Sequence, residues 1–442
     1  MDLKLTSIAA CIGITLVSVM ASLAADKPVD KTSDQWFQWR GPNRDGKSPD
    51  TGLLKSWPEG GPKLMWTVPL IGQGFSSVSV GGGLIYTTGR RPPGNPSTLP
   101  KVKNVYKLPG NRYYVTAIDM DGKVKWVRNV TKCYRGYYPG TRSTPTYDNG
   151  NIYLETGAGI VICCDAQTGK TKWMRDIHKD FNGITPEGHT FGRSESVLII
   201  GDLAIVTPGG EDAFMVALDK KTGKTVWKSG KYSAAAHTSP IYVVYEGVPI
   251  IINGANQGLI CIHAKTGKIQ WTRDFAKGAR GRVPTPGFVE GGYVYWAVGY
   301  GKGGICMKLS ASGRKVKAKE LWRSDDMDCI VGGFVIHDGY IYGNNKNGYA
   351  CLELKTGKTM WTTDGEKVGG KGSICWADGM FYLYAQKDGK ASLATCSPKG
   401  MEIKGTVSVP GMDQSWAHPV VYGGRLYLRY DNNLYCFDVK AK

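Results

Sequence analysis

The stretch Ala217-Leu-Asp219-Lys-Lys-Thr-Gly223-Lys-Thr-Val-Trp227 decides the fold, because close copies of it recur along the chain. Each copy reads as a short strand, a tight turn through glycine and a second strand that ends at a tryptophan. A repeat of about 40–50 residues built from short strands is typical of a β-propeller. A weaker copy lies near Val407, and the six clear copies end at Trp126, Trp173, Trp227, Trp271, Trp322 and Trp361.

A second motif precedes each tryptophan phrase and supplies two more strands. It is a short strand, a turn with glycine and an apolar strand that often ends in tyrosine, as at Thr144–Tyr153 and His418–Tyr427. The chain contains eight such starts. Each repeat is then four antiparallel strands, so the sequence predicts an all-β fold, an eight-bladed β-propeller.

The two ends of the propeller are predicted to close on each other. Seven tryptophan-type strands follow the eight starts, while Lys63–Thr67, which contains Trp66, precedes the first start without a blade of its own. We expect residues 63–68 to complete the last blade by pairing with residues 434–440, since closure removes exposed strand edges. Trp66 then joins the other six tryptophans as a docking residue that packs between blades.

Cysteine occupies a packing position in the repeat. One position of the third strand reads Ala117, Cys163, Ala217, Cys261, Cys306, Cys351, Ala394 and Cys436. Alternation of Ala and Cys indicates a small buried site rather than disulfides. We expect Cys163 and Cys164 to be reduced thiols on opposite faces of a strand, and any disulfide to come from Cys133, Cys329, Cys375 or Cys396. Zinc-ligand spacing is absent from the sequence, so no structural metal is predicted.

The first 25 residues resemble a secretory signal peptide, with Lys4, an apolar core and small residues before Asp26. A lipoprotein cleavage site at Cys11 is a weaker alternative. The predicted organisation is a signal peptide at 1–25, an extended leader at 26–62 and the propeller at 63–442. We therefore expect an exported protein of the periplasm or cell envelope, without a transmembrane span in the mature chain.

The chain is strongly basic, with a formal net charge of +19 at pH 7. Such a surface favours anionic partners, including lipid headgroups, acidic protein faces and anionic polysaccharide. Nucleic acid is also anionic, but an exported protein is the least suited to meet it, so no nucleic acid is expected as a partner. Peripheral association with a membrane stays open.

At the tryptophan phrases the chain resembles the quinoprotein-like propeller repeat, over about residues 60–440. That resemblance implies one of two branches: dehydrogenases that use pyrroloquinoline quinone (PQQ) with Ca²⁺, or non-enzymatic propellers of the BamB outer-membrane assembly type. The leader Trp36–Gly46 is also similar to the opening of exported bacterial PQQ-like repeat proteins. The chain departs from the dehydrogenase pattern: a convincing Asn/Glu/Asp set is missing, Cys163-Cys164 lies elsewhere in the blade, and the Cys-x-x-Cys-His haem motif is absent.

Unequal loops indicate which face binds. The connections from each tryptophan strand to the next blade are long, and a Pro-rich basic insertion at 89–112 lies on the same side. Residues just before each first strand are expected at the mouth of the central channel, and they are Phe75, Arg142, Arg193, Glu195, His237, Arg282, Lys371 and Trp416. The arginines suit carboxylates or phosphates, and the aromatic rings could stack on a flat ligand.

The sequence favours a non-catalytic scaffold that binds an envelope protein or an anionic ligand on this long-loop face. Glu195 could act as a base or a Ca²⁺ ligand, but an ion pair with Arg193 or Arg142 is preferred. His189 and His237 are the histidines expected on the binding face. The alternatives are a PQQ-dependent oxidoreductase and a protein that binds anionic envelope polysaccharide.

Overall fold

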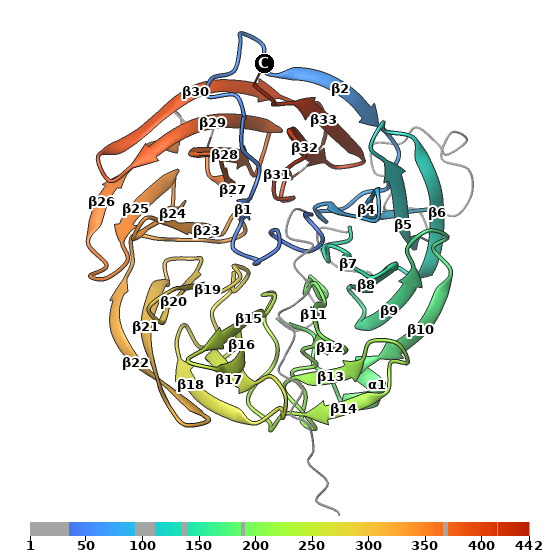
Figure 1. Cartoon of the computed structure of the whole chain (residues 1–442), viewed down its shortest axis with the longest axis vertical. Coiled ribbons are helices and arrows are strands. Elements are labelled where there is room, and N and C mark those ends of the chain that lie inside the picture. The colour runs from blue at the N-terminus through green and yellow to red at the C-terminus, as the bar shows by residue number, and fades with distance from the viewer. Residues whose placement is uncertain are drawn as a thin grey trace, which may run out of the picture. The chain divides into compact units, whose positions relative to one another are not determined.

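The computed structural model describes residues 35–92, 111–134, 140–186, 191–365, 370–412 and 414–441. Residues 35–441 belong to one compact unit in which eight antiparallel sheets, the blades, surround a central axis (Figure 1). The predicted all-β, eight-bladed propeller is confirmed. One short helix is present in the described part, α1 (Ile177–Phe181), which Asp176 caps by accepting from the His178 and Lys179 backbone amides. The described part contains no helix that meets the length and hydropathy needed to span a membrane.

Blades 1 to 4 follow one another in chain order, and the strands of each blade run in chain order from the axis outward. Blade 1 is β3 (Ser79–Gly81), β4 (Leu84–Arg91), β5 (Arg112–Asp119) and β6 (Val124–Lys132). Blade 2 is β7 (Thr146–Asp148), β8 (Asn151–Glu155), β9 (Ile160–Asp165) and β10 (Thr171–Asp176). Blade 3 is β11 (Leu198–Ile200), β12 (Leu203–Val206), β13 (Val216–Asp219) and β14 (Thr225–Lys228). Blade 4 is β15 (Ile241–Tyr245), β16 (Val248–Gly254), β17 (Gly258–His263) and β18 (Ile269–Asp274).

Blades 5 to 8 complete the ring. Blade 5 is β19 (Gly287–Val289), β20 (Tyr293–Val298), β21 (Gly303–Ser312) and β22 (Lys315–Ser324). Blade 6 is β23 (Phe334–His337), β24 (Tyr340–Asn344), β25 (Tyr349–Glu353) and β26 (Thr359–Thr362). Blade 7 is β27 (Gly372–Ala377), β28 (Met380–Ala385), β29 (Lys390–Ser397) and β30 (Gly400–Ser408). Blade 8 is β31 (Val420–Tyr422), β32 (Arg425–Tyr430), β33 (Asn433–Asp438) and β2 (Lys63–Val68).

The ring closes by joining the two ends of the propeller. β2 pairs antiparallel with β33, from Lys63 opposite Asp438 to Val68 opposite Leu434. Trp66 stands opposite Cys436 in this pairing. The predicted contact between residues 63–68 and 434–440 is therefore present, and it supplies the outer strand that blade 8 would otherwise lack.

The Ala or Cys position is small because it faces the docking tryptophan of its own blade. Cys163 lies opposite Trp173, and Cys261 lies opposite Trp271, with the same pairing in the other tryptophan blades. The turn glycine packs against the tryptophan of the preceding blade. At Gly223, for example, φ is +71° and an added Cβ would lie 2.8 Å from the Trp173 ring. Glycine is required there for both conformation and space.

Most docking tryptophans also donate a hydrogen bond across the blade interface. Their indole nitrogens reach turn carbonyls of the next blade, on Met120, Ala166, Lys220, Ala264, Leu354 and Ser397. Trp271 Nε1 has no such partner among the described residues. In the adjacent blade 5, β21 and β22 extend past the usual turn, and the Leu309 carbonyl there accepts from the Tyr245 hydroxyl at 3.0 Å.

Blade 7 departs from the repeat at one point. We expected the weak copy of the tryptophan phrase near Val407, whereas the register places Ile403 opposite Ala394. Ile403 therefore occupies the docking position. Val407 instead packs in the apolar cluster beside Trp57 of the leader.

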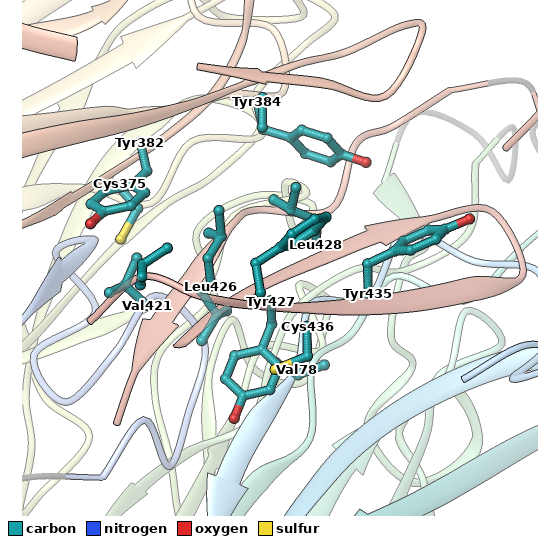
Figure 2. Close-up of a cluster of buried hydrophobic side chains, with 14 of the residues drawn as sticks. Val78, Cys375, Tyr382, Tyr384, Val421, Leu426, Tyr427, Leu428, Tyr435 and Cys436 are labelled. Carbon is teal, nitrogen blue, oxygen red and sulfur yellow. The ribbon is translucent and has the colours of Figure 1, made fainter. Parts of the chain in front are cut away.

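Apolar clusters fill the spaces between neighbouring blades. Figure 2 shows part of the largest, which joins blades 7, 8 and 1. Tyr427 and Leu428 extend to opposite faces of blade 8, toward Val78 and Tyr384 respectively. Since each blade buries both faces, the strands read as nearly continuous apolar runs.

The ten cysteines in the described residues are free thiols. Cys163 packs between blades 2 and 3, and Cys164 packs between blades 1 and 2, so the two side chains take opposite faces as expected. Burial raises the pKa of the Cys164 thiol to about 11. The two thiols serve packing in this structure.

The leader crosses the axis of the ring and hydrogen-bonds to every blade (Figure 1). β1 (Lys47–Ser48) adds to blade 7 by pairing parallel with β27. Trp39 Nε1 donates to Thr285 Oγ1 of blade 5 at 2.9 Å. Contacts to the remaining blades reach Val80, Tyr147, Val197, Pro240, Phe334 and His418.

Two buried arginines anchor the leader through backbone carbonyls. Arg44 donates to Ser196 O at 3.1 Å, Pro240 O at 3.0 Å and Val197 O at 2.6 Å, which ties blades 3 and 4 together. Arg40 donates to Phe334 O and contacts His418 Nδ1 at 3.3 Å. The planar guanidinium suits this role because it presents five donors in a fixed geometry.

Candidate functional site

A cavity of about 180 Å³ lies on the axis, on the side of the loops that lead into each blade. Every blade except blade 7 contributes to its wall, and Trp39 of the leader joins them. Its lining residues are Trp39, Phe75, Arg142, Phe191, Ser194, His237, Ser239, Gly281, Val283, Tyr300, Ile330, Val331, Trp416 and His418. We call it the axial pocket.

The axial pocket brings together four of the eight residues expected at the channel mouth: Phe75, Arg142, His237 and Trp416. The rings of Phe75 and Trp416 lie 4.7 Å apart at 38°. The Arg142 guanidinium lies 5.3 Å from the Phe75 ring centroid, in a cation–π arrangement. The Pro-rich insertion, apart from its ends in β4 and β5, and His189 lie outside the described residues.

Arg193 lies inside the protein, away from the pocket wall. Its side chain is 2% exposed and forms a salt bridge with Glu155, at the end of β8. It also donates to the Ile184 carbonyl at 2.9 Å and to the Thr207 carbonyl. The expected pair between Arg193 and Glu195 is therefore wrong, because the carboxylate of the preceding blade takes the arginine.

Glu195 is buried beside this pair. Burial, and then the like charge of Glu155, raise the pKa of Glu195 to about 8. Its Oε1 atom has no hydrogen-bond partner in the described part of the chain. Glu195 is thus largely protonated at neutral pH and does not line the pocket.

Arg282 and Lys371 also lie apart from the axial pocket. Arg282 is 2% exposed, and its guanidinium donates to the Ala279 carbonyl. Its own backbone carbonyl accepts from the His237 backbone amide. Lys371 lines a separate, open depression near blade 7, together with Lys346, Asp364, Lys387 and Asp388. The sequence placed these residues before the correct strands, but it could not show which side chains turn inward.

His237 is the buried polar group of the pocket. Its Nδ1 atom lies 3.0 Å from Ser194 Oγ, and its Nε2 atom has no hydrogen-bond partner in the described residues. Burial, and then the charges of Arg142, Arg282 and Arg193, lower the pKa of His237 to about 3. The ring is therefore neutral at physiological pH.

Sequence reasoning missed four aromatic wall residues, Trp39, Phe191, Tyr300 and His418. Trp39 packs edge-on against His418, with centroids 4.6 Å apart. His418 Nε2 lies 3.1 Å from the Val331 carbonyl. His418 stands before β31 just as His237 stands before β15, and that shared position was the available signal.

The residues present do not fit a Ca²⁺–quinone site. Within the described residues, no group of three or more His, Cys, Asp or Glu side chains could hold a metal ion. Glu155 is paired to arginine and the pKa of Glu195 is raised, so neither offers a free carboxylate at neutral pH. The pocket wall offers one cation, two neutral imidazoles, hydroxyls and aromatic rings, which suit binding.

Comparisons with known proteins agree with this propeller. The model of the family described as outer membrane protein assembly factor BamB matches residues 111–363. A search of curated proteins finds no match. BamB from Moraxella catarrhalis has a similar fold, with a TM-score of 0.57 and 15% identity over 86% of this chain and 98% of that one.

Two enzymes share the fold to a similar degree. A europium-containing methanol dehydrogenase gives a TM-score of 0.60 and 13% identity, covering 89% of each chain. Quinohemoprotein alcohol dehydrogenase from Comamonas testosteroni gives 0.61 and 12%, covering 93% of this chain and 81% of that one. At these identities the likeness shows the fold alone.

Proposed function

We propose, since the chain belongs to the family described as outer membrane protein assembly factor BamB, that it is a non-catalytic scaffold of the cell envelope. In this proposal an exported, rigid ring binds a partner protein on the face where its long loops gather. The axial pocket receives the central contact. The leader supports that pocket from within, through Trp39.

The observation that carries the proposal is the composition of the axial pocket. Seven blades and the leader converge on one cavity whose wall is mainly apolar and aromatic. Tyr, Trp, Phe and Arg are the residues that dominate binding energy at protein interfaces. Two charged side chains near it form contacts within the protein: Arg193 forms a salt bridge with Glu155, and Arg44 donates to backbone carbonyls.

Affinity capture with matched variants tests the proposal. The mature chain, Trp416→Ala and Lys371→Ala would be used to capture proteins from envelope extract of the producing cells. Trp416 lines the pocket and Lys371 lies outside it. We therefore expect Trp416→Ala to capture at least ten-fold less of a specific partner, and Lys371→Ala to capture an unchanged amount. Equal capture by both variants, or no specific partner, would remove the proposal.

A second candidate function is quinone-dependent oxidation, which the Phe75–Trp416 pair with Arg142 on the axis favours, although the described residues offer no Ca²⁺ ligand set. Titration with PQQ and Ca²⁺ decides it. The scaffold proposal expects no saturable change in quinone absorbance at tens of micromolar. A saturable change that Trp416→Ala abolishes would favour the enzyme.

A further inference from the structure

We propose that the axial pocket binds one six-membered aromatic ring that carries an acidic oxygen, a phenol or a carboxylate. This inference rests on the proposed function, since it names the chemical group that the pocket would recognise. The same group is offered by a small aromatic acid and by a tyrosine side chain of a partner protein.

Size sets the first limit on the ligand. The cavity measures about 180 Å³. An apolar cavity of roughly 150 Å³ holds benzene. One ring with a small substituent therefore fills the axial pocket, whereas three fused rings exceed it.

The wall selects an aromatic ring over an aliphatic one. Phe75 and Trp416 form one side at 4.7 Å from each other, and Phe191 packs edge-on against His237 at 6.1 Å. Trp39 and Tyr300 contribute further surface. Ring edges and faces presented together suit stacked and edge-to-face contacts, each worth about 0.5–1.5 kcal/mol beyond burial.

An unpartnered polar atom of a wall residue favours an oxygen on that ring. His237 is 7% exposed, lines the pocket, and leaves Nε2 without a partner in the described residues. Ser194 Oγ lies beside Nδ1, so either tautomer is available. A phenol can donate to Nε2 or accept from it, and a carboxylate can accept from Nε2–H. An unpaired buried nitrogen costs about 1–3 kcal/mol, so a ligand that pairs it gains selectivity.

Charge favours an acidic oxygen. Arg142 is part of the wall, and the side chains of Arg193 and Arg282 also act on His237. Glu155 neutralises Arg193 through their salt bridge, while the proton on Glu195 removes the second acidic charge. The pKa of Arg142 is lowered by burial only to about 10, so this arginine stays charged at neutral pH. The described groups around the pocket are therefore net positive.

Calorimetric titration of the full mature chain tests the inference with defined probes. We expect 4-hydroxybenzoate and p-cresol to bind, and to bind at least ten-fold more tightly than cyclohexanecarboxylate. Trp416→Ala should abolish the binding and Lys371→Ala should leave it unchanged. Equal affinities for the aromatic and aliphatic acids, or binding that survives Trp416→Ala, would overturn the inference.

The polar contact has its own variant. His237→Phe keeps a buried ring but removes the nitrogen, so the preference for p-cresol over toluene should fall at least five-fold while toluene binding persists. Ser194→Ala removes the hydroxyl that contacts Nδ1 and donates to the His237 carbonyl. It serves if His237→Phe does not fold, and it should lower the same preference. An unchanged preference in the folded variant contradicts the inferred role of His237.

Competition separates the two sources of the ring. N-acetyltyrosinamide should compete with 4-hydroxybenzoate, and 4-hydroxybenzoate should displace a captured partner if that partner inserts a tyrosine. Persistent capture beside bound 4-hydroxybenzoate assigns the site to a free aromatic acid. If Trp416→Ala loses the captured partner but no aromatic probe binds the protein, the scaffold proposal stands and the aromatic-ring inference fails. If the probes bind but no partner is captured, the aromatic-ring inference stands and the scaffold proposal fails.

Discussion

At the residue scale, the position that faces each docking tryptophan explains why this chain uses cysteine without disulfides. Five of the seven tryptophan blades place Cys there and two place Ala, while blade 7 has Ala394 opposite Ile403. The residue opposite is the tryptophan, as in Cys351 opposite Trp361, so we expect little space for a longer side chain. Cysteine adds a little apolar volume at a site that alanine also satisfies.

Substitutions at Cys351 test this packing account. Cys351→Ala should cost less than about 1.5 kcal/mol, while Cys351→Leu should cost about 1–3 kcal/mol or more through overpacking against Trp361. Urea unfolding followed by circular dichroism measures both. Leucine tolerated as well as alanine would show that the position is not constrained by the tryptophan.

Glu195 predicts a pH dependence of stability. Its pKa is raised from the ordinary 4.5 to about 8, so the folded state holds a proton that the unfolded state releases. The stabilisation is complete below pH 4.5 and is lost as the pH rises through about 8. Glu195→Gln should therefore melt about 2 °C or more above the wild type at pH 9, and the gap should close near pH 4.5.

Glu320 provides the control of opposite sign. Hydrogen bonding to Arg323 and Arg273 holds the pKa of Glu320 below its usual value, so its ionised form stabilises the fold above pH 4.5. Glu320→Gln should lower the melting temperature slightly at pH 9. The same response from both variants would contradict the assignment of a protonated Glu195.

The repeat revealed which residues pack, but it could not reveal which buried charges pair. The tryptophan register and the Ala/Cys position follow from local sequence, since both recur with the repeat. The partner of Arg193 is Glu155, in the preceding blade, whereas the nearest carboxylate in sequence is Glu195. Position in the repeat correctly predicted four wall residues: Phe75, Arg142, His237 and Trp416. It could not separate them from the other four candidates, because the inward turn of a loop side chain depends on tertiary packing.

At the element scale, the leader acts as part of the ring. It reaches all eight blades through hydrogen bonds, and Trp39 contributes to the pocket wall. Its sequence, with five prolines and five glycines in residues 26–62, gives no strand or helix period. Only the structure shows that Arg40 and Arg44 are buried.

Arg44→Ala tests the contribution of the leader. It removes donors from the carbonyls of Ser196, Val197 and Pro240, so we expect a loss on the order of 3 kcal/mol in the free energy of unfolding. Lys55→Ala in the same leader breaks an exposed salt bridge with Asp378 and should cost less than about 1 kcal/mol. Similar costs for the two variants would mean that the leader does not hold the blades.

At the scale of the whole molecule, the pairing of β2 with β33 makes the ring one closed unit. Without it blade 8 would expose β33 as a free edge, and the ends of the ring could separate. Closure also fixes the axial pocket, because Phe75 of blade 1 and Trp416 of blade 8 lie on either side of that junction.

A staple across the junction tests closure. Lys63 and Asp438 are direct partners, so Lys63→Cys with Asp438→Cys should form a disulfide on mild oxidation and resist unfolding by about 3 kcal/mol or more. Lys63→Cys with Asp119→Cys, which does not face it, is the control and should stay reduced. The native thiols are largely buried and should not interfere. If the facing pair of cysteines fails to form a disulfide, the ring is open at this junction.

Site-specific photocrosslinking in the producing cells tests the central claim, that the loop face around the axial pocket binds a partner. A photoreactive phenylalanine analogue would replace Phe75 at the pocket, and Val226, an exposed residue on outer strand β14, in the control. The account predicts a discrete crosslinked protein from position 75 and none from position 226. Crosslinks from position 226 alone would contradict it.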